Sequence, residues 1–216
     1  MELTTNYILI FAMSYLLGAI PFSYILVKVS SGKDLRDEGS GNLGTLNSYE
    51  VSKNKIIAIS VLILDMFKAT ISIEILATLF GIHNSIGTII AGTAIIAGHN
   101  WNIFLRFRGG RGLAPAAGIS MVVNFYPLII WLASWAISKA FTKNIHISNC
   151  ISSILTIAIL WISPSDLIFS FDSWDNITPD ALRILFTAIN ILIILSHYKV
   201  LIEYKDAILR RSNAND

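Results

Sequence analysis

The residues best suited to chemistry gather in one stretch, Gly98 to Pro115, which lies between two apolar segments. It contains one histidine, two asparagines, three arginines and a cluster of glycines. Glycine adopts backbone angles closed to other residues, so the N–H groups of a glycine loop can converge on an anion. Arginine guanidinium groups bind phosphate. A helix that begins after Gly112 would direct the positive end of its dipole to the same point. The pattern indicates a phosphate site. The alternative is a cytoplasmic loop whose arginines only fix topology and meet lipid head groups.

A second glycine-rich stretch, Gly39 to Gly44, precedes it in the chain. Its small residues would let the backbone approach a ligand, and Ser40, Asn42 and Asn47 would supply hydrogen bonds. A flexible turn between two helices is the alternative for this stretch alone. Two glycine loops on one membrane face, one basic and one rich in Ser and Asn, favour a shared site.

The composition places these loops in a membrane protein. Hydrophobic residues make up 54% of the chain and charged residues only 14%, with a mean hydropathy of +0.65, far from the averages of soluble proteins. The single cysteine, Cys150, excludes an internal disulfide, and we expect it to be a small core residue. The sequence shows no metal-ligand cluster, nucleophile elbow or Walker loop, so we expect no metal, no cofactor and no nucleic-acid partner.

We expect an all-α polytopic helix bundle that forms a single integral membrane domain over residues 1–216. Polar loops are expected at 30–55 and 163–180, a turn at Phe125–Pro127, and a polar tail after Ser196. Pro21, which follows Gly18, should kink or break the first span. The segments predicted to span or enter the membrane, about seven in all, are Tyr7–Val29, Ile56–Phe80, Ile86–Ala97, Leu113–Asn124, Leu128–Phe141, Ile147–Ile162 and Ala181–Ser196.

The basic residues orient this bundle. If successive segments alternate, one side receives nearly every lysine and arginine, and the other side, with the N-terminus and the loop 163–180, receives none. The positive-inside rule then predicts an N-terminus outside and a C-terminus in the cytoplasm. Only Lys68 and Arg183 fall within or at the edge of a span. Both glycine loops would face the cytoplasm from the inner (plasma) membrane.

Five further polar residues lie at or within the spans. Asp65 and Lys68 stand three residues apart on one helix face, as either part of a polar site or a structural salt bridge. His99, at a helix end, could act as a base, or could cap the helix and contact phosphate. His146 and His197 lie at span ends, where we expect structural roles.

These stretches resemble the bacterial acyl-phosphate:glycerol-3-phosphate acyltransferase family of integral membrane enzymes. The resemblance runs through Tyr15–Phe22, Gly32–Gly44 and Leu64–Lys68, and is strongest from Gly98 to Gly112. It covers the first half of the chain in order, spacing and placement between spans. The second half matches only in its pattern of spans.

The resemblance implies transfer of a fatty acyl group from acyl phosphate to the 1-hydroxyl of glycerol 3-phosphate, which yields lysophosphatidic acid and phosphate for phospholipid synthesis. It implies a seven-span bundle with membrane lipids as neighbours and a site on the cytoplasmic side. Acyl phosphate carries a good leaving group, so the site would hold two phosphates and a carbonyl in register without a protein nucleophile. The implied catalytic residues are Ser40 and His99, and the implied substrate-binding residues are Asn42, Asn47, Asn100, Arg106, Arg108, Gly109, Gly110, Arg111 and Gly112.

The sequence departs from the family pattern at several motif positions. Leu46 and Glu50 stand where threonine and arginine are usual, and Val200 stands where an asparagine is expected after His197. Arg108 and Arg111 replace two lysines, which keeps the charge but changes its shape. A carboxylate in place of a phosphate-binding cation would repel the ligand. The alternative is therefore a catalytically silent paralogue that binds lipid or phosphate ligands in the membrane.

Overall fold

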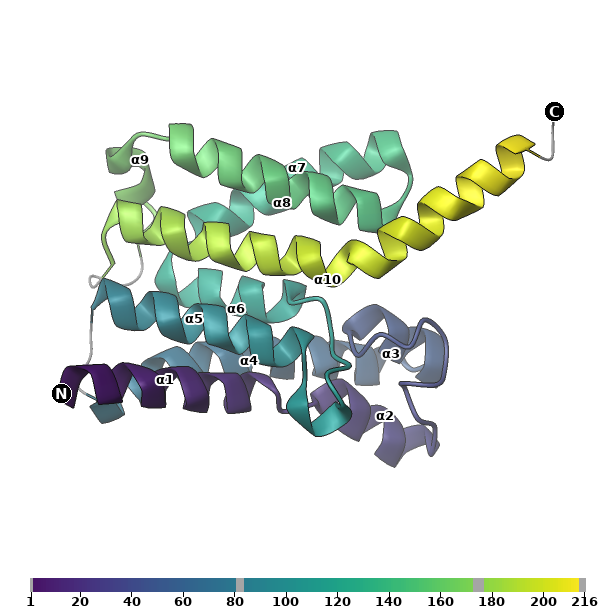
Figure 1. Ribbon diagram of the computed structural model, residues 1–216, viewed down its shortest axis with the longest axis horizontal. Helices are drawn as coiled ribbons and strands as arrows, with labels where there is room; N and C mark the ends of the chain where they lie inside the picture. Colours follow the sequence, from purple (N-terminus) through teal and green to yellow (C-terminus); the bar gives the residue numbers. More distant parts are fainter. Residues whose placement is uncertain (1, 81–83, 173–176, 214–216) are drawn as a thin grey trace.

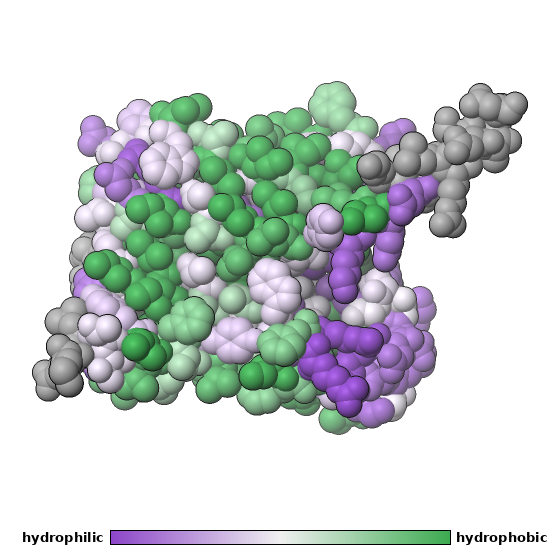
Figure 2. All heavy atoms as spheres, in the orientation of Figure 1, coloured by the Kyte–Doolittle hydropathy of each residue, from purple (hydrophilic) through white to green (hydrophobic). Residues whose placement is uncertain are grey.

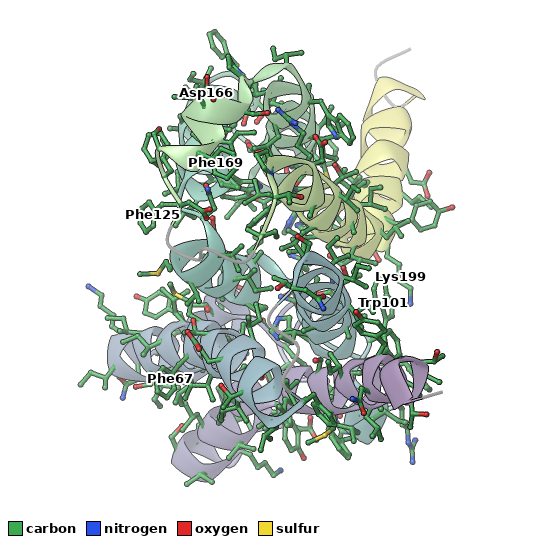
Figure 3. The ribbon with its side chains drawn as sticks, turned by 90° about the vertical axis from the view of Figure 1, so that its left-hand side faces the viewer. Phe67, Trp101, Phe125, Asp166, Phe169 and Lys199 are labelled. Atoms are coloured by element: carbon green, nitrogen blue, oxygen red, sulfur yellow. The ribbon has the colours of Figure 1, made fainter. Side chains whose placement is uncertain are left out.

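A computed structural model describes residues 2–80, 84–172 and 177–213 of the chain. Long helices packed side by side form the body of the molecule (Figure 1). Viewed along these helices, the side chains fill the spaces between them, and Phe125 and Phe169 lie on the outside (Figure 3). The long helices are α1 (Glu2–Gly18), α4 (Lys55–Phe80), α5 (Ser85–Asn100), α6 (Leu113–Val123), α7 (Tyr126–Thr142), α8 (Ile145–Ile162) and α10 (Pro179–Asn213).

Helices form here because apolar segments in lipid must satisfy their backbone hydrogen bonds internally. Within the described residues, four segments are long and apolar enough to cross a bilayer: Thr4–Ser31, Lys55–Phe80, Ile145–Ile162 and Pro179–Tyr204. Every segment predicted to span or enter the membrane is helical, and the molecule is an all-helical membrane protein. The number of crossings stays a prediction.

The first predicted span is broken where the sequence indicated. Helix α1 ends at Gly18, and α2 (Phe22–Ser31) begins after Pro21, which cannot donate a backbone hydrogen bond. The break leaves the carbonyl groups of Ala19 and Ile20 without helical partners. Both carbonyls accept hydrogen bonds from the site described below.

Four expectations about the connections are corrected. The polar stretch after α2 contains a helix, α3 (Thr45–Ser52), whose buried face is Asn47, Ser48 and Val51. The loop 163–180 contains the short helix α9 (Ser165–Phe169). Helix α7 starts at Tyr126, because proline is tolerated in the first turn of a helix, so the turn is shorter than predicted. The tail after Ser196 is helical, since it continues α10 (Figure 1).

Two apolar cores hold the molecule together. The larger lies within the bundle, where Ile95 and Ile96 of α5 meet Ile119 of α6 and Leu185 and Ile189 of α10. The smaller lies beneath the loops at one end and consists of Val27, Leu35, Leu43, Val51 and Leu105. This second core attaches both glycine-rich stretches to α2 and α3.

The connections divide between the two ends of the bundle. The start of α1 and the short helix α9 lie at one end, while both glycine loops, the α7–α8 turn and the end of α10 lie at the other (Figure 1). Hydrophilic residues gather around α2 and α3, and hydrophobic residues cover the middle of the visible face (Figure 2). This division matches the alternation that the predicted topology requires. Which end faces the cytoplasm stays a prediction.

Candidate functional site

The two glycine-rich loops, far apart in sequence, are joined by a backbone hydrogen bond. Leu43 N donates to Gly109 O at 3.1 Å, so the first loop lies directly against the second. Ser23 Oγ of α2 donates to Leu43 O at 2.9 Å and fixes the same residue from the other side. The shared site inferred from the sequence therefore has a physical counterpart at one end of the bundle.

Asn47 organises the first loop from within. Its Oδ1 accepts from Ser40 N at 2.9 Å, and its Nδ2 lies within hydrogen-bonding range of the carbonyls of Leu35, Glu38 and Asn42. The side chain is buried, so it holds the loop in shape instead of facing an open site. The Ser40 side chain is exposed, and that of Asn42 is half-buried.

The second loop is held against α1 and its own helix. Asn102 Nδ2 donates to Ala19 O in the break after α1, and Tyr15 OH of α1 donates to Trp101 O. Gly110 N donates to His99 O at 3.0 Å, which folds the loop back over the end of α5. These contacts place the loop and His99 in a fixed relationship.

Most glycines of this loop are needed because the loop backbone lies close to His99, and not because they adopt unusual backbone angles. Of the three after Arg108, only Gly112 has a positive φ, of 78°, while two residues with side chains, Arg106 and Phe107, have φ values of 56° and 59°. A Cβ on Gly110 would lie 2.1 Å from His99 Nε2, and one on Gly109 would lie 2.2 Å from His99 O. The loop can approach His99 this closely only because these two residues lack a Cβ.

A buried ion pair lies beside His99. Lys68 Nζ of α4 is 2.8 Å from Asp65 Oδ1, 2.9 Å from Ile20 O and 3.2 Å from His99 Nδ1. Asp65 and Lys68 thus form the salt bridge that one reading of the sequence predicted. The same lysine also reaches into the site, so the two readings are compatible. Asp65, Lys68 and His99 line a small cavity with Ile20–Ser23, Leu43, Asn102, Gly109 and Gly110.

The three acceptors around Lys68 determine where the proton on His99 sits. An ammonium group has three donors, which match Asp65, Ile20 O and His99 Nδ1 one to one. His99 Nδ1 then accepts, so the proton of the neutral ring is on Nε2, the atom that faces Gly110. In this arrangement His99 presents a hydrogen-bond donor to the glycine loop. It favours phosphate contact or charge stabilisation over a role as general base.

The side chains of the three arginines of the loop lie in different environments. Arg106 is exposed, and Arg108 Nη1 lies 3.5 Å from Asp37 Oδ1 in an exposed contact that links the two loops. Arg111 is half-buried, and its Nη1 lies 3.1 Å from His146 Nδ1 of α8. Burial lowers the pKa of the Arg111 guanidinium, although the side chain stays charged at physiological pH.

Asn100 also faces away from the His99 cavity. Its Nδ2 donates to Leu192 O of α10 at 3.2 Å, while its Oδ1 is buried without a hydrogen-bond partner. A Cβ on Gly112 would lie 3.0 Å from this Oδ1. The two predicted neighbours, His99 and Asn100, therefore serve opposite sides of α5.

A larger apolar cavity of about 330 Å³ lies among α4, α6, α7, α8 and α10. Leu113, two residues after Arg111, lines it together with Ile145, the residue before His146. The Arg111–His146 contact therefore lies near the edge of the cavity. The apolar lining of this cavity suits a hydrocarbon tail.

Sequence reasoning did not assign four contributors to the site. Lys68 and Asp65 were recognised as a pair but not placed beside His99. Asn102 was counted in its stretch without a role, and Ser23 was not singled out. A lysine within a span is itself a functional signal, because buried charge is costly. Its partner on α5 is not readable from the sequence, since the contact joins residues that are 31 positions apart.

The fold and the loops define a membrane helix-bundle protein with a polar, glycine-lined site at one end. The chain belongs to the glycerol-3-phosphate acyltransferase family, whose model matches residues 8–206. A protein of that name from Anaplasma phagocytophilum (strain HZ) is 31% identical over 191 residues, which cover 88% of this chain and 91% of the relative. One from Thermoanaerobacter pseudethanolicus (strain ATCC 33223 / 39E) is 38% identical over 161 residues, covering 73% and 79%.

The fold is also similar to that of a solved membrane protein. The crystal structure of PlsY (YgiH), an integral membrane glycerol 3-phosphate acyltransferase in its glycerol 3-phosphate form, aligns with a TM-score of 0.72. The alignment covers 93% of this chain and 92% of that chain at 24% identity, so it shows the fold alone. The lysophosphatidic acid form of the same protein aligns with a TM-score of 0.71.

Proposed function

We propose that the protein transfers a fatty acyl group from acyl phosphate to the 1-hydroxyl of glycerol 3-phosphate and releases lysophosphatidic acid and phosphate. The observation that carries this proposal is the backbone hydrogen bond from Leu43 N to Gly109 O, which joins the two glycine loops beside His99. Family membership supports the same activity, and the silent paralogue is not favoured. The relatives that match most of the chain are named as acyltransferases.

The geometry suits two anionic substrates. Among the described residues, Arg111 forms no direct ion pair with a carboxylate, although the negative charge of Glu203 acts on it, so its guanidinium can bind a phosphate. The acyl chain of acyl phosphate would lie in the apolar cavity. Glycerol 3-phosphate would bind at the glycine loop, near Arg108 and the exposed hydroxyl of Ser40.

The reaction needs no covalent enzyme intermediate. The 1-hydroxyl oxygen forms a bond to the acyl carbon, the bond from that carbon to the phosphate oxygen breaks, and the released phosphate takes up the hydroxyl proton. The loop would hold the two substrates in register, which supplies much of the rate enhancement of such a transfer. His99 Nε2–H and the loop N–H groups would stabilise charge that develops on the reacting oxygens.

The proposed location is the inner (plasma) membrane, crossed seven times, with the N-terminus outside and the C-terminus in the cytoplasm. Under this orientation, both glycine loops meet cytoplasmic glycerol 3-phosphate. The grouping of these loops with the C-terminus at one end of the bundle supports it (Figure 1).

The test is phosphate release by the purified protein in detergent. Release from palmitoyl phosphate should require glycerol 3-phosphate, and glycerol, which lacks the phosphate, should not replace it. Arg111→Ala should raise the KM for glycerol 3-phosphate. Phosphate release that is the same with and without glycerol 3-phosphate would overturn the proposal.

A further inference from the structure

We propose that Ala117 of α6 is a specificity-determining residue, whose small side chain lets the apolar cavity accept long acyl chains. The inference rests on the proposed function, which places the acyl chain of acyl phosphate in this cavity. It goes further by naming the residue that decides how far the chain can extend, and by assigning the protein to long-chain acyl phosphates.

Helix α6 connects the glycine loop to the cavity. It begins directly after Gly112, and its first residue, Leu113, already lines the cavity. Ala116, Ala117 and Ser120 continue the lining, because residues three, four and seven positions after Leu113 lie on the same face of a helix. At about 1.5 Å per residue, Ala117 lies roughly 6 Å beyond Leu113. A chain that extends from the loop along this face therefore passes Ala117 before it reaches the far part of the cavity.

Contacts on its other sides hold α6 in place. A Cβ on Gly118, the neighbour of Ala117, would lie 2.3 Å from Met66 O, so the backbone of α6 packs directly against α4. Ser120 Oγ accepts from Leu128 N at 3.1 Å, which fixes the end of α6 to the start of α7. The short side chain of Ala117 therefore faces a space that α6 cannot close by moving.

The lining of the cavity suits hydrocarbon along most of its length, because its polar side chains bond to other protein groups. Asn149 Oδ1 accepts from Trp135 Nε1 at 2.9 Å, and Asn149 Nδ2 lies 3.1 Å from His197 Nε2. Thr156 Oγ1 donates to Ser152 O at 2.8 Å. Each methylene that an acyl chain buries against such a lining contributes about fourfold to affinity. Long chains should therefore bind more tightly than short ones.

The cavity also reaches the surface of the bundle. Leu62 of α4 and Leu132 of α7 line it and are 38% and 51% exposed, whereas the other lining residues are half-buried or buried. Both helices pack on α6. An acyl chain dissolved in the membrane can therefore enter between α4 and α7 without crossing the polar end of the bundle.

The experiment compares Ala117→Leu with Ala133→Leu, a control at an exposed position on α7 outside the cavity. Phosphate release that depends on glycerol 3-phosphate is measured with butyryl, octanoyl and palmitoyl phosphate at a fixed detergent concentration. Ala117→Leu should raise the KM for palmitoyl phosphate by about tenfold or more, because the larger side chain displaces several buried methylenes. The KM values for butyryl phosphate and glycerol 3-phosphate should stay within about twofold, since neither substrate reaches Ala117.

Octanoyl phosphate should show a smaller effect than palmitoyl phosphate, and Ala117→Val should lie between the unaltered protein and Ala117→Leu. Ala133→Leu should leave every constant unchanged. The melting temperature of Ala117→Leu should not fall, because the new side chain fills an existing space. An unchanged KM for palmitoyl phosphate, or an equal loss with butyryl and palmitoyl phosphate, would overturn the inference.

Binding of hexadecylphosphonate and butylphosphonate tests the cavity without turnover. Ala117→Leu should weaken the binding of hexadecylphosphonate and leave that of butylphosphonate unchanged, and equal binding of hexadecylphosphonate by the variant and the unaltered protein would again overturn the inference. Absence of glycerol 3-phosphate-dependent release from every acyl phosphate in the unaltered protein would instead overturn the proposed function. The two failures are thus distinguishable.

Discussion

Lys68 Nζ lies 3.2 Å from His99 Nδ1, which connects an ion pair inside α4 to the residue at the end of α5 beneath the glycine loop. The same ammonium bonds Ile20 O in the break between α1 and α2. One side chain therefore joins three helical segments at the site. The buried charge of Lys68 contributes both to the packing of the bundle and to the orientation of His99.

Replacing Lys68 with methionine should strongly destabilise the protein, because Asp65 would remain as a buried, unpaired carboxylate. Breaking a buried pair in this way costs about 3–5 kcal/mol. The double variant Asp65→Asn/Lys68→Met should recover part of the loss in thermal unfolding measured in detergent. Lys55→Met, at an exposed position at the start of the same helix, is the control. Equal melting temperatures for Lys68→Met and the control would contradict the prediction.

Replacing Gly110 with alanine should impair activity by displacing His99. The added Cβ would lie 2.1 Å from His99 Nε2, so the ring or the loop must move. Misplacing a reacting group by about 1 Å can cost on the order of 10²-fold in rate. Gly92→Ala is the matched control, because its Cβ would lie close only to the flexible end of Leu185, at 2.8 Å, and would meet Ile119 at an ordinary 3.8 Å. Similar kcat/KM values for the two variants would show that the loop tolerates the change.

The long helices could be predicted because their apolar runs approach the length of a bilayer and end at polar residues. Helix α3 could not, since its eight residues lie in a polar stretch beside several glycines. Of its buried residues, only Val51 is apolar and packs in the small core. Likewise, α10 continues beyond Ser196 without the apolar pattern that identified its first part.

The sequence predicted which loops form the site, but not how their side chains are oriented. Residue types and spacing placed Ser40, His99 and Arg111 on the same end of the bundle. They gave no means of knowing that Asn47 turns inward or that Arg111 meets His146. Such directions depend on contacts between distant helices, which a single sequence does not record.

Replacing Asn47 with alanine should loosen the first glycine loop, because one amide group contacts four of its backbone groups. Each lost bond contributes roughly 0.5–1.5 kcal/mol, and buried groups would be left unpaired. Trypsin should then cleave faster after Arg36. Asn47→Asp keeps the acceptor for Ser40 N but loses the amide donors, so its cleavage rate should be intermediate. A rate unchanged in Asn47→Ala would show that the loop holds its shape without this side chain.

The proposed orientation can be tested with single cysteines in a Cys150→Ser background. A cysteine in place of Ser165 should react with an impermeant maleimide added to intact cells, whereas one in place of Lys33 should not. Both positions are exposed, and they lie at opposite ends of the bundle (Figure 1). Permeabilised cells, in which both cysteines should react, provide the control. The reverse labelling pattern would place the site away from cytoplasmic glycerol 3-phosphate.

The last prediction concerns Glu50, which occupies the position of a family arginine. Arg36, Lys53 or Lys55 could take over the role of the missing arginine, with Glu50 paired to one of them. Arg36 is instead bonded to Asp34 at 2.9 Å and 2.7 Å and lies over the Tyr24 ring. Neither lysine forms an ion pair among the described residues. Glu50 is exposed on α3 and forms no ion pair among the described residues. It is therefore a repulsive charge near the first loop and not a support for another cation.

Glu50→Arg should consequently lower the KM for glycerol 3-phosphate, by about tenfold for each 1.4 kcal/mol that the new contact contributes. Glu50→Gln removes the repulsion without adding a cation, so it should produce a smaller decrease. Because the effect is electrostatic at an exposed position, rising salt should reduce the difference between the variants. The measurement is the KM for each substrate at low and high ionic strength, with palmitoyl phosphate as the internal comparison. A higher KM for glycerol 3-phosphate in Glu50→Arg would mean that Glu50 supports a cation after all, and an unchanged value would place its side chain outside the field of the site.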